Sequence, residues 1–204
     1  MDESHAERTD EELMAAHARG DEGAFAELFQ RYAGRLFGYL RHMSGDRELA
    51  MDLVQETFLR AHRARHRFDA TRPFRPWIFR IASRVQVDHA RSWLGWLSLR
   101  SVSLFGGEDE AAPAWADRLA GVPAQEPARV AEARDLSARV RAEIGRLPLP
   151  YRRALLLHDL EGLNCREVAE VTGRPIGTVL SWVHRGRALL RERLEAAGGK
   201  DAWS

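Results

Sequence analysis

The chain has 204 residues, of which 45% are hydrophobic, and a formal net charge of +1, so it can form one large or two small globular domains with packed cores. Its single cysteine, Cys165, excludes an internal disulfide and a cysteine-based zinc site. No apolar run reaches the roughly 18 residues of a membrane span, and the acidic N-terminal stretch is unlike a secretory signal; we therefore expect a cytoplasmic protein without membrane insertion.

The first half of the chain has the periodicity of helices. Apolar residues between Phe25 and Leu40 recur at spacings of three and four, which predicts a helix with one buried face. A second helix is predicted from about Asp46 to Arg65. A third is predicted to begin at Pro73 or Pro76 and to continue to His89, because proline suits the first turn of a helix. Together these segments predict an all-helical domain over residues 10–92.

Charge is distributed unevenly along the chain. Nine arginines and two acids lie between Phe58 and Arg91, whereas the stretch from Gly106 to Glu126 has five acids and one arginine. Five arginines and one acid follow between Arg174 and Arg193. Two basic segments around an acidic stretch that contains proline and glycine predict two domains joined by a flexible linker, which we place at residues 93–127. The linker begins with an apolar run, Trp93 to Phe105, for which we expect contact with a partner or with the neighbouring domain.

A second helical domain is predicted over residues 128–197. Within it, Asn164 can cap a helix that has Glu167 three residues later, as in a capping box. Gly173 is predicted to end this helix and Pro175 to begin the next. The inward face of that next helix is predicted to hold Ile176, Val179, Val183 and Leu190. Two short helices joined by a turn that contains glycine are typical of a helix-turn-helix, in which the second helix can enter the major groove of DNA; an ordinary helical hairpin has a similar pattern.

Two long stretches of the chain are distinctive: DLVQETFLRAHRARHRFDATRPFRPWIFRIASRVQVDHAR and LPLPYRRALLLHDLEGLNCREVAEVTGRPIGTVLSWVHRGRALLRERL. The first resembles region 2, and the second resembles region 4, of bacterial RNA polymerase sigma factors of the extracytoplasmic-function (ECF) group. The order and spacing of both stretches are more specific than a lone helix-turn-helix. The resemblance implies an all-α protein of two small helical domains that binds core RNA polymerase, recognises promoter DNA and helps to open the −10 element.

The resemblance also implies which residues make these contacts. The residues that it assigns to polymerase binding are Asp52, Leu53, Gln55, Glu56 and Phe58, although Leu53 and Phe58 fit a core position equally well. The residues that it assigns to the −10 element are Arg72, Phe74, Arg75, Arg80, Arg84 and Arg91; the arginines would hold phosphates, and Phe74 would help to form a pocket for an unstacked base. The residues that it assigns to the −35 element are Arg174, Thr178, Ser181, Trp182, His184 and Arg185.

The chain departs from the family pattern within its −35 reader. Leu180 and Trp182 stand where the family commonly has lysine or arginine, and each lost cation removes a possible phosphate or guanine contact. Three interpretations of Trp182 remain open: contact with a thymine methyl, packing against the linker or region 2, and contact with an inhibitor. We expect Trp77, a further aromatic residue of region 2, to lie in the core.

Other functions fit the sequence less well. One alternative is a helix-turn-helix regulator that never joins polymerase, and another is a sigma-like protein whose altered helix serves mainly protein contact. No set of nucleophile, base and acid suggests an enzyme, and we predict no catalytic residue, cofactor or metal. His62 and His66 have the spacing of zinc ligands, but neighbouring arginines oppose a cation, so a solvated helix face is expected. The expected partners are core RNA polymerase, promoter DNA and an anti-sigma factor, the last because ECF factors are commonly held by one.

Overall fold

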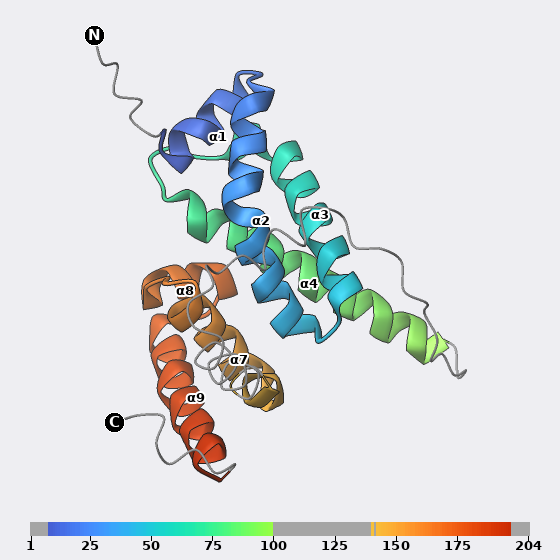
Figure 1. Ribbon diagram of the computed structural model, residues 1–204, viewed down its shortest axis with the longest axis vertical. Helices are drawn as coiled ribbons and strands as arrows, with labels where there is room; N and C mark the ends of the chain where they lie inside the picture. Colours follow the sequence, from blue (N-terminus) through green and yellow to red (C-terminus); the bar gives the residue numbers. More distant parts are fainter. Residues whose placement is uncertain (1–7, 100–139, 141, 197–204) are drawn as a thin grey trace, which may run out of the picture.

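The computed structural model describes residues 8–99, 140 and 142–196. Within these residues every regular element is a helix (Figure 1), which confirms the all-α prediction. The first domain contains α1 (Asp10–Ala18), α2 (Glu22–Ser44), α3 (Arg47–Arg63), the 3-10 turn η1 (Arg65–Arg67) and α4 (Phe74–Leu99). The second contains α7 (Leu149–Leu155), the π-helical turn η2 (Leu156–Leu160), α8 (Cys165–Thr172) and α9 (Ile176–Ala196).

The core of the first domain lies where α3 and α4 pack against α2. The predicted apolar face of α2 is buried, with Leu28, Leu36 and Leu40 fully inaccessible to solvent. The second predicted helix begins one residue after Asp46, whose carboxylate accepts a hydrogen bond from the backbone N–H of Leu49 at 3.1 Å. This N-cap satisfies one of the backbone donors that a helix leaves free at its start.

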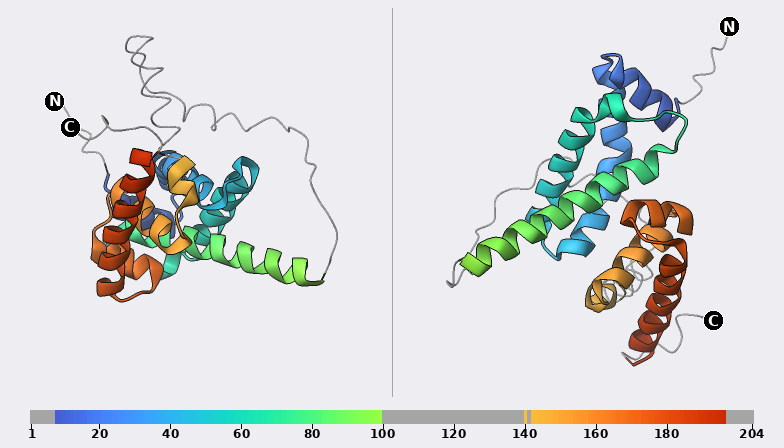
Figure 2. Two further views of the ribbon diagram at one scale, coloured as in Figure 1. Left: turned by 90° about the horizontal axis from the view of Figure 1, so that it is seen from below. Right: turned by 180° about the vertical axis from the view of Figure 1, so that it is seen from behind.

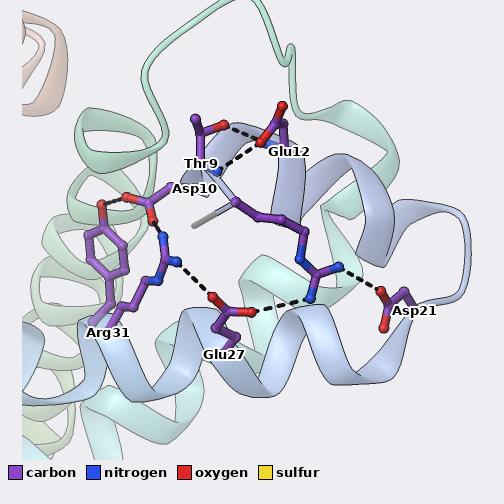
Figure 3. A network of polar contacts seen from close by, with 8 residues as sticks. Thr9, Asp10, Glu12, Asp21, Glu27 and Arg31 are labelled. Atoms are coloured by element: carbon purple, nitrogen blue, oxygen red, sulfur yellow. Dashed lines mark hydrogen bonds and ion pairs between the residues drawn. The ribbon is translucent and has the colours of Figure 1, made fainter. Parts of the chain in front are cut away.

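A polar network fastens α1 to α2 (Figure 3). Arg31 donates to the carboxylates of Asp10 and Glu27, at 2.7 Å in each case. The hydroxyl of Tyr32 donates to the second oxygen of Asp10. Burial, followed by the nearby Asp10 carboxylate, raises the pKa of Tyr32 above its usual value, so this hydroxyl remains a donor at any physiological pH.

The helix α4 is longer than the sequence predicted. It continues to Leu99, so residues 93–99, which we had assigned to the linker, extend this helix, and Figure 2 shows its C-terminal end projecting beyond the other helices. The rest of the apolar run to Phe105, and of the linker to residue 127, lies outside the described residues. The domain boundaries at 92 and 128 therefore stay predictions.

The helix-turn-helix forms as its local sequence predicted. The side-chain oxygen of Asn164 accepts the backbone N–H of Glu167 at 3.0 Å, and the Glu167 carboxylate accepts the N–H of Asn164 at 2.8 Å, which completes the capping box. Gly173 ends α8 with a left-handed φ of 65°, a conformation that glycine adopts without steric cost. Val179 and Val183 of α9 are buried. The prediction for Ile176 was wrong, because this first residue of the helix lies beyond the core and is 43% exposed.

The two domains contact each other through α8, which packs on α4, and through α7, which touches α2. The most extensive polar contact centres on Glu161, which follows η2 and is only 8% exposed. Arg35 of α2 donates through Nε to the Glu161 carboxylate and through Nη2 to its carbonyl, both at 3.0 Å. Arg153 of α7 donates to Gln86 of α4 at 3.0 Å. We call the contact between Arg35 and Glu161 the interdomain clasp.

Candidate nucleic-acid interface

One polar rim lies along the outer face of α3, where the resemblance implied polymerase binding. Asp52 and Gln55 are exposed and Glu56 is half-buried. Arg60 donates to Glu56 at 2.7 Å and to Asp88 of α4 at 2.6 Å, and these hydrogen bonds, that of Asp88 first, raise the pKa of Arg60. The pair of contacts fixes α3 against α4 and leaves Asp52 and Gln55 available to a partner.

The two apolar residues assigned to the same contact lie beneath that rim. Phe58 belongs to the core, where its ring lies 4.6 Å from that of Phe29, measured between centroids. Leu53 is also buried and forms part of the floor of a shallow hollow between α3 and α4. Both face inward because they lie on the same side of α3 as Val54 and Ala61. The assignment of Phe58 as a direct contact is therefore corrected to a core position that supports the rim.

The basic surface of the first domain follows α4 and the loop before it. Arg72, Arg80, Arg84 and Arg91 are exposed, as phosphate-binding side chains must be. Arg75 is half-buried, and its guanidinium lies 3.5 Å from the backbone carbonyl of Glu161 in the second domain. Four of the five predicted arginines thus face solvent, whereas Arg75 takes part in the contact between the domains.

Phe74 does not line an open pocket. Its side chain is fully buried, and its ring makes edge contacts with those of Tyr32 and Phe68 at centroid distances of 5.1 and 5.7 Å. Its backbone N–H donates to Glu11 of α1 at 2.7 Å. Because this residue begins α4, its burial anchors the helix and the loop before it. The expectation that Phe74 helps to hold a flipped base is corrected accordingly.

A hollow of about 650 Å³ lies beside that loop, and α8 of the second domain closes its other side. The first domain contributes Arg72, Trp77 and Arg80, and α8 contributes Glu167 and Glu170. The loop itself is ordered by Asp69, whose carboxylate accepts the hydroxyl of Thr71 at 2.7 Å and its N–H at 3.0 Å, contacts that lower the pKa of Asp69. Trp77 is only partly buried, so one part of it faces this hollow while the rest packs on the core.

The residues assigned to the −35 element lie just before α9 and in the N-terminal half of that helix. Arg174, His184 and Arg185 are exposed, and Thr178 and Ser181 are half-buried. Within the described part of the chain, no carboxylate forms an ion pair with Arg174 or Arg185. Arg187 differs from them, because Asp159 accepts its Nε–H at 3.1 Å and so holds it against η2.

The two departures from the family pattern have different environments. Trp182 is half-buried and packs against the hydrophobic core, so part of its ring stays accessible, and the three interpretations of this residue stay predictions. Leu180 has no such role, since 52% of it is exposed.

The described residues provide no support for a metal or membrane site. They contain no group of three or more histidine, cysteine, aspartate or glutamate side chains that could hold a metal ion. His62 is exposed, as expected, but its Nδ1 lies 3.1 Å from Nε2 of the buried His17. Among the described helices, none is long and apolar enough to cross a lipid bilayer.

Sequence reasoning missed the residues that join the two domains. Arg35 and Glu161 are separated by 126 positions, and each alone has the pattern of a solvated charge. The burial of Glu161, which raises its pKa against the opposing effect of Arg35, becomes visible only once the domains are packed.

Two protein-family models match the chain. The model described as Sigma-70 region 2 matches residues 28–94, and the model described as Sigma-70, region 4 matches residues 137–190. The first match includes the polar rim of α3 and the arginines of α4, and the second includes the helix-turn-helix.

Similar proteins match over both domains. The RNA polymerase sigma factor NccH of Alcaligenes xylosoxydans xylosoxydans is 34% identical, over 92% of this chain and 96% of its own length. The ECF RNA polymerase sigma factor SigM of Mycobacterium tuberculosis is 31% identical, over 92% of this chain and 86% of its own. The solved structure of CnrH in complex with the cytosolic domain of CnrY has a TM-score of 0.64 and 26% identity, over 93% of this chain and 99% of that one.

Proposed function

Because this chain belongs to the ECF sigma factors of the sigma-70 family, we propose that it initiates transcription through three separate surfaces, each of which binds a different partner. As a sigma factor, it binds core RNA polymerase, directs promoter recognition and helps to open the −10 element. One observation carries this assignment. The segment matched as region 2 leaves a polar face on α3 and a basic face on α4 exposed, and the segment matched as region 4 leaves a basic face at the start of α9 exposed. The α3 rim would bind polymerase, the α4 arginines the −10 element, and the start of α9 the −35 element.

The polymerase surface consists of Asp52, Gln55 and Glu56, with Leu53 beneath them. An exposed polar rim beside a small apolar floor has the composition of a protein interface of moderate size. The adjacent contacts of Arg60 with Glu56 and Asp88 hold this rim in one shape before the partner arrives, which lowers the entropy cost of binding.

The −10 surface consists of Arg72, Arg80, Arg84 and Arg91 as phosphate contacts, with Trp77 at its edge. Single-stranded DNA is held by a basic track together with aromatic faces on which bases stack. With Phe74 in the core, two aromatic side chains, Phe68 and Trp77, line the hollow, and of these Trp77 lies on α4 with Arg80 and Arg84. We therefore assign base stacking to Trp77 rather than to Phe74.

The −35 surface consists of Arg174, which precedes α9, and of residues in the N-terminal half of that helix: Thr178, Ser181, Trp182, His184 and Arg185. The second helix of a helix-turn-helix reads base edges with its N-terminal residues. Arg174 and Arg185 are the preferred phosphate contacts, because both are exposed and neither has a carboxylate partner among the described residues.

A regulatory protein partner belongs to this proposal. CnrH, with which this chain shares its fold and 26% of its residues, was solved together with the cytosolic domain of CnrY. We expect a partner of the anti-sigma type for this chain as well. The place of action is that of core polymerase, the cytoplasm.

Transcription by core polymerase, with and without this protein, tests the function directly. Fragments of the source genome serve as templates, and start sites that depend on the protein are the expected result. If no such sites appear and the protein does not associate with core polymerase, the sigma function is refuted. A helix-turn-helix regulator would instead bind its site without polymerase.

A combined variant, D52A/Q55A/E56A, tests the polymerase surface. Association with core polymerase should be lost while the helical circular dichroism signal and the melting temperature stay close to those of the wild type. The control E22A/Q30A changes exposed polar residues of α2 and should bind normally. Normal binding by the triple variant would contradict this assignment.

A further inference from the structure

Among the described residues of α9 beyond its first turn, Leu180 is the one large apolar side chain that is exposed. Ile176, which is 43% exposed, lies one helical turn before it, and residues at this spacing are neighbours on a helix surface. Isolated exposed leucines are ordinary features of protein surfaces. Here, however, two large apolar side chains are adjacent, and they lie in the two turns that a helix-turn-helix presents to bases.

The surroundings of this apolar pair indicate a polyanionic partner. No aspartate or glutamate occurs between Gly173 and Arg191, and Arg174, His184 and Arg185 are exposed around the same end of the helix. This excess of basic side chains attracts a negatively charged partner such as nucleic acid and does not favour a protein surface that lacks acids or is itself basic. Leu180 and Trp182 both stand where the family commonly has lysine or arginine. Trp182 packs against the core, whereas the side chain of Leu180 is exposed.

The chemistry of the major groove then identifies what an exposed leucine can recognise. Leucine has no donor or acceptor for a base edge, and the one apolar group that base pairs present in this groove is the C5-methyl of thymine. We propose that Leu180, supported by Ile176, contacts a thymine methyl in the upstream promoter element and thereby makes this chain prefer thymine at that position. The inference rests on the proposed −35 role of α9, and it names the contact that replaces the missing cation.

Replacing thymine by deoxyuridine tests this contact, because the exchange removes only the methyl group. The probe is a promoter that the holoenzyme selects from random duplexes, with each upstream thymine replaced in turn. At one position the replacement should weaken wild-type holoenzyme binding about fourfold, the effect of one methyl leaving an apolar contact. In L180A the same replacement should have no effect, while L149A, which changes an exposed leucine of α7, should keep the wild-type sensitivity.

A second variant, which keeps a long side chain at position 180, separates the effect of the methyl contact from the loss of packing in L180A. L180K restores a cation, so it should remove the sensitivity to deoxyuridine and increase the salt dependence of binding by about one phosphate contact. If deoxyuridine has no effect at any upstream position, or has equal effects in wild type and L180A, Leu180 does not contact a methyl, and a protein partner becomes the alternative for this pair. If the holoenzyme selects no duplex at all, the proposed function fails before this inference is tested.

Discussion

Among the described residues of the first domain, one histidine is buried. His17 is only 4% exposed, and its ring stacks on Phe25 at 4.3 Å between centroids. Burial lowers the pKa of His17, and the nearby charges of His62 and Arg65 act in the same direction, against a hydrogen bond and charge of Asp21. Protonation of this ring would place a charge beside the rings of Phe25 and His62.

The resulting prediction concerns the free energy of unfolding. The unfolded chain takes up a proton on this histidine at about pH 6.5, whereas the folded domain takes it up only at lower pH. Stability should therefore fall as the pH falls below about 6.5, by at most about 1.4 kcal/mol per pH unit from this group. Urea unfolding between pH 7.5 and 5.5 measures the slope. H17Q should show a smaller slope than the wild type, and H66Q, which changes an exposed histidine, should keep the wild-type slope.

At the scale of elements, the position of the recognition helix depends on the cap of the helix before it. The capping box of Asn164 and Glu167 fixes the first turn of α8, and Gly173 ends that helix by a left-handed turn. We predict that N164A destabilises the second domain by about 1 kcal/mol, because it leaves two backbone N–H groups without their acceptor. N164S, which can form the same box, should retain most of that stability in thermal unfolding; equal losses in both variants would contradict a capping role.

The contact between α7 and α9 depends on a glycine inside a helix. A Cβ atom on Gly186 would lie 3.1 Å from Leu155 and 3.3 Å from the Cβ of Tyr151, so there is no room for a branched side chain. We predict that G186V destabilises the second domain by about 1–3 kcal/mol through overpacking. The matched change G38A in α2, where no atom lies within 4 Å of the added Cβ, should raise stability by about 0.5–1 kcal/mol. Denaturant unfolding of both variants measures these differences.

The elements that the sequence predicted well are those with local causes. The cap at Asn164, the stop at Gly173 and the buried face of α2 each depend on residues within one or two turns of one another. The prediction failed for Ile176 because its position relative to the core depends on where α9 crosses α7. The surface or core position of Phe74 depends likewise on the packing of Tyr32 and Phe68, which no local pattern of α4 specifies.

At the scale of the whole molecule, the packing of α8 on α4 places the second domain over one side of the hollow beside the −10 surface. Arg72 and Arg80 then face Glu167 and Glu170 across that hollow, where single-stranded DNA would have to enter. Nothing in the local sequence of either domain predicts this packing, since it depends on contacts such as the interdomain clasp. If single-stranded DNA binds in this hollow, as we propose, we expect α8 to move away from α4.

The clasp can be tested by removing its acid. We predict that E161A increases the radius of gyration in small-angle X-ray scattering and strengthens binding of a single-stranded −10 probe. The reason is that Arg35 loses the carboxylate that it contacts at 3.0 Å. The control E195A changes an exposed acid at the end of α9 and should match the wild type in both measurements. An unchanged radius together with unchanged probe binding would show that the clasp does not hold the domains together.

The buried Glu161 therefore has a consequence for affinity as well as for shape. A ligand that binds only the separated domains has an apparent dissociation constant equal to its intrinsic one divided by the fraction of molecules that are open. Each 1.4 kcal/mol by which the packed arrangement is favoured thus weakens apparent promoter-strand affinity about tenfold. The number of free molecules that can engage a −10 strand would then be set by a population ratio between two arrangements of the same chain. A residue that touches no DNA would control that ratio.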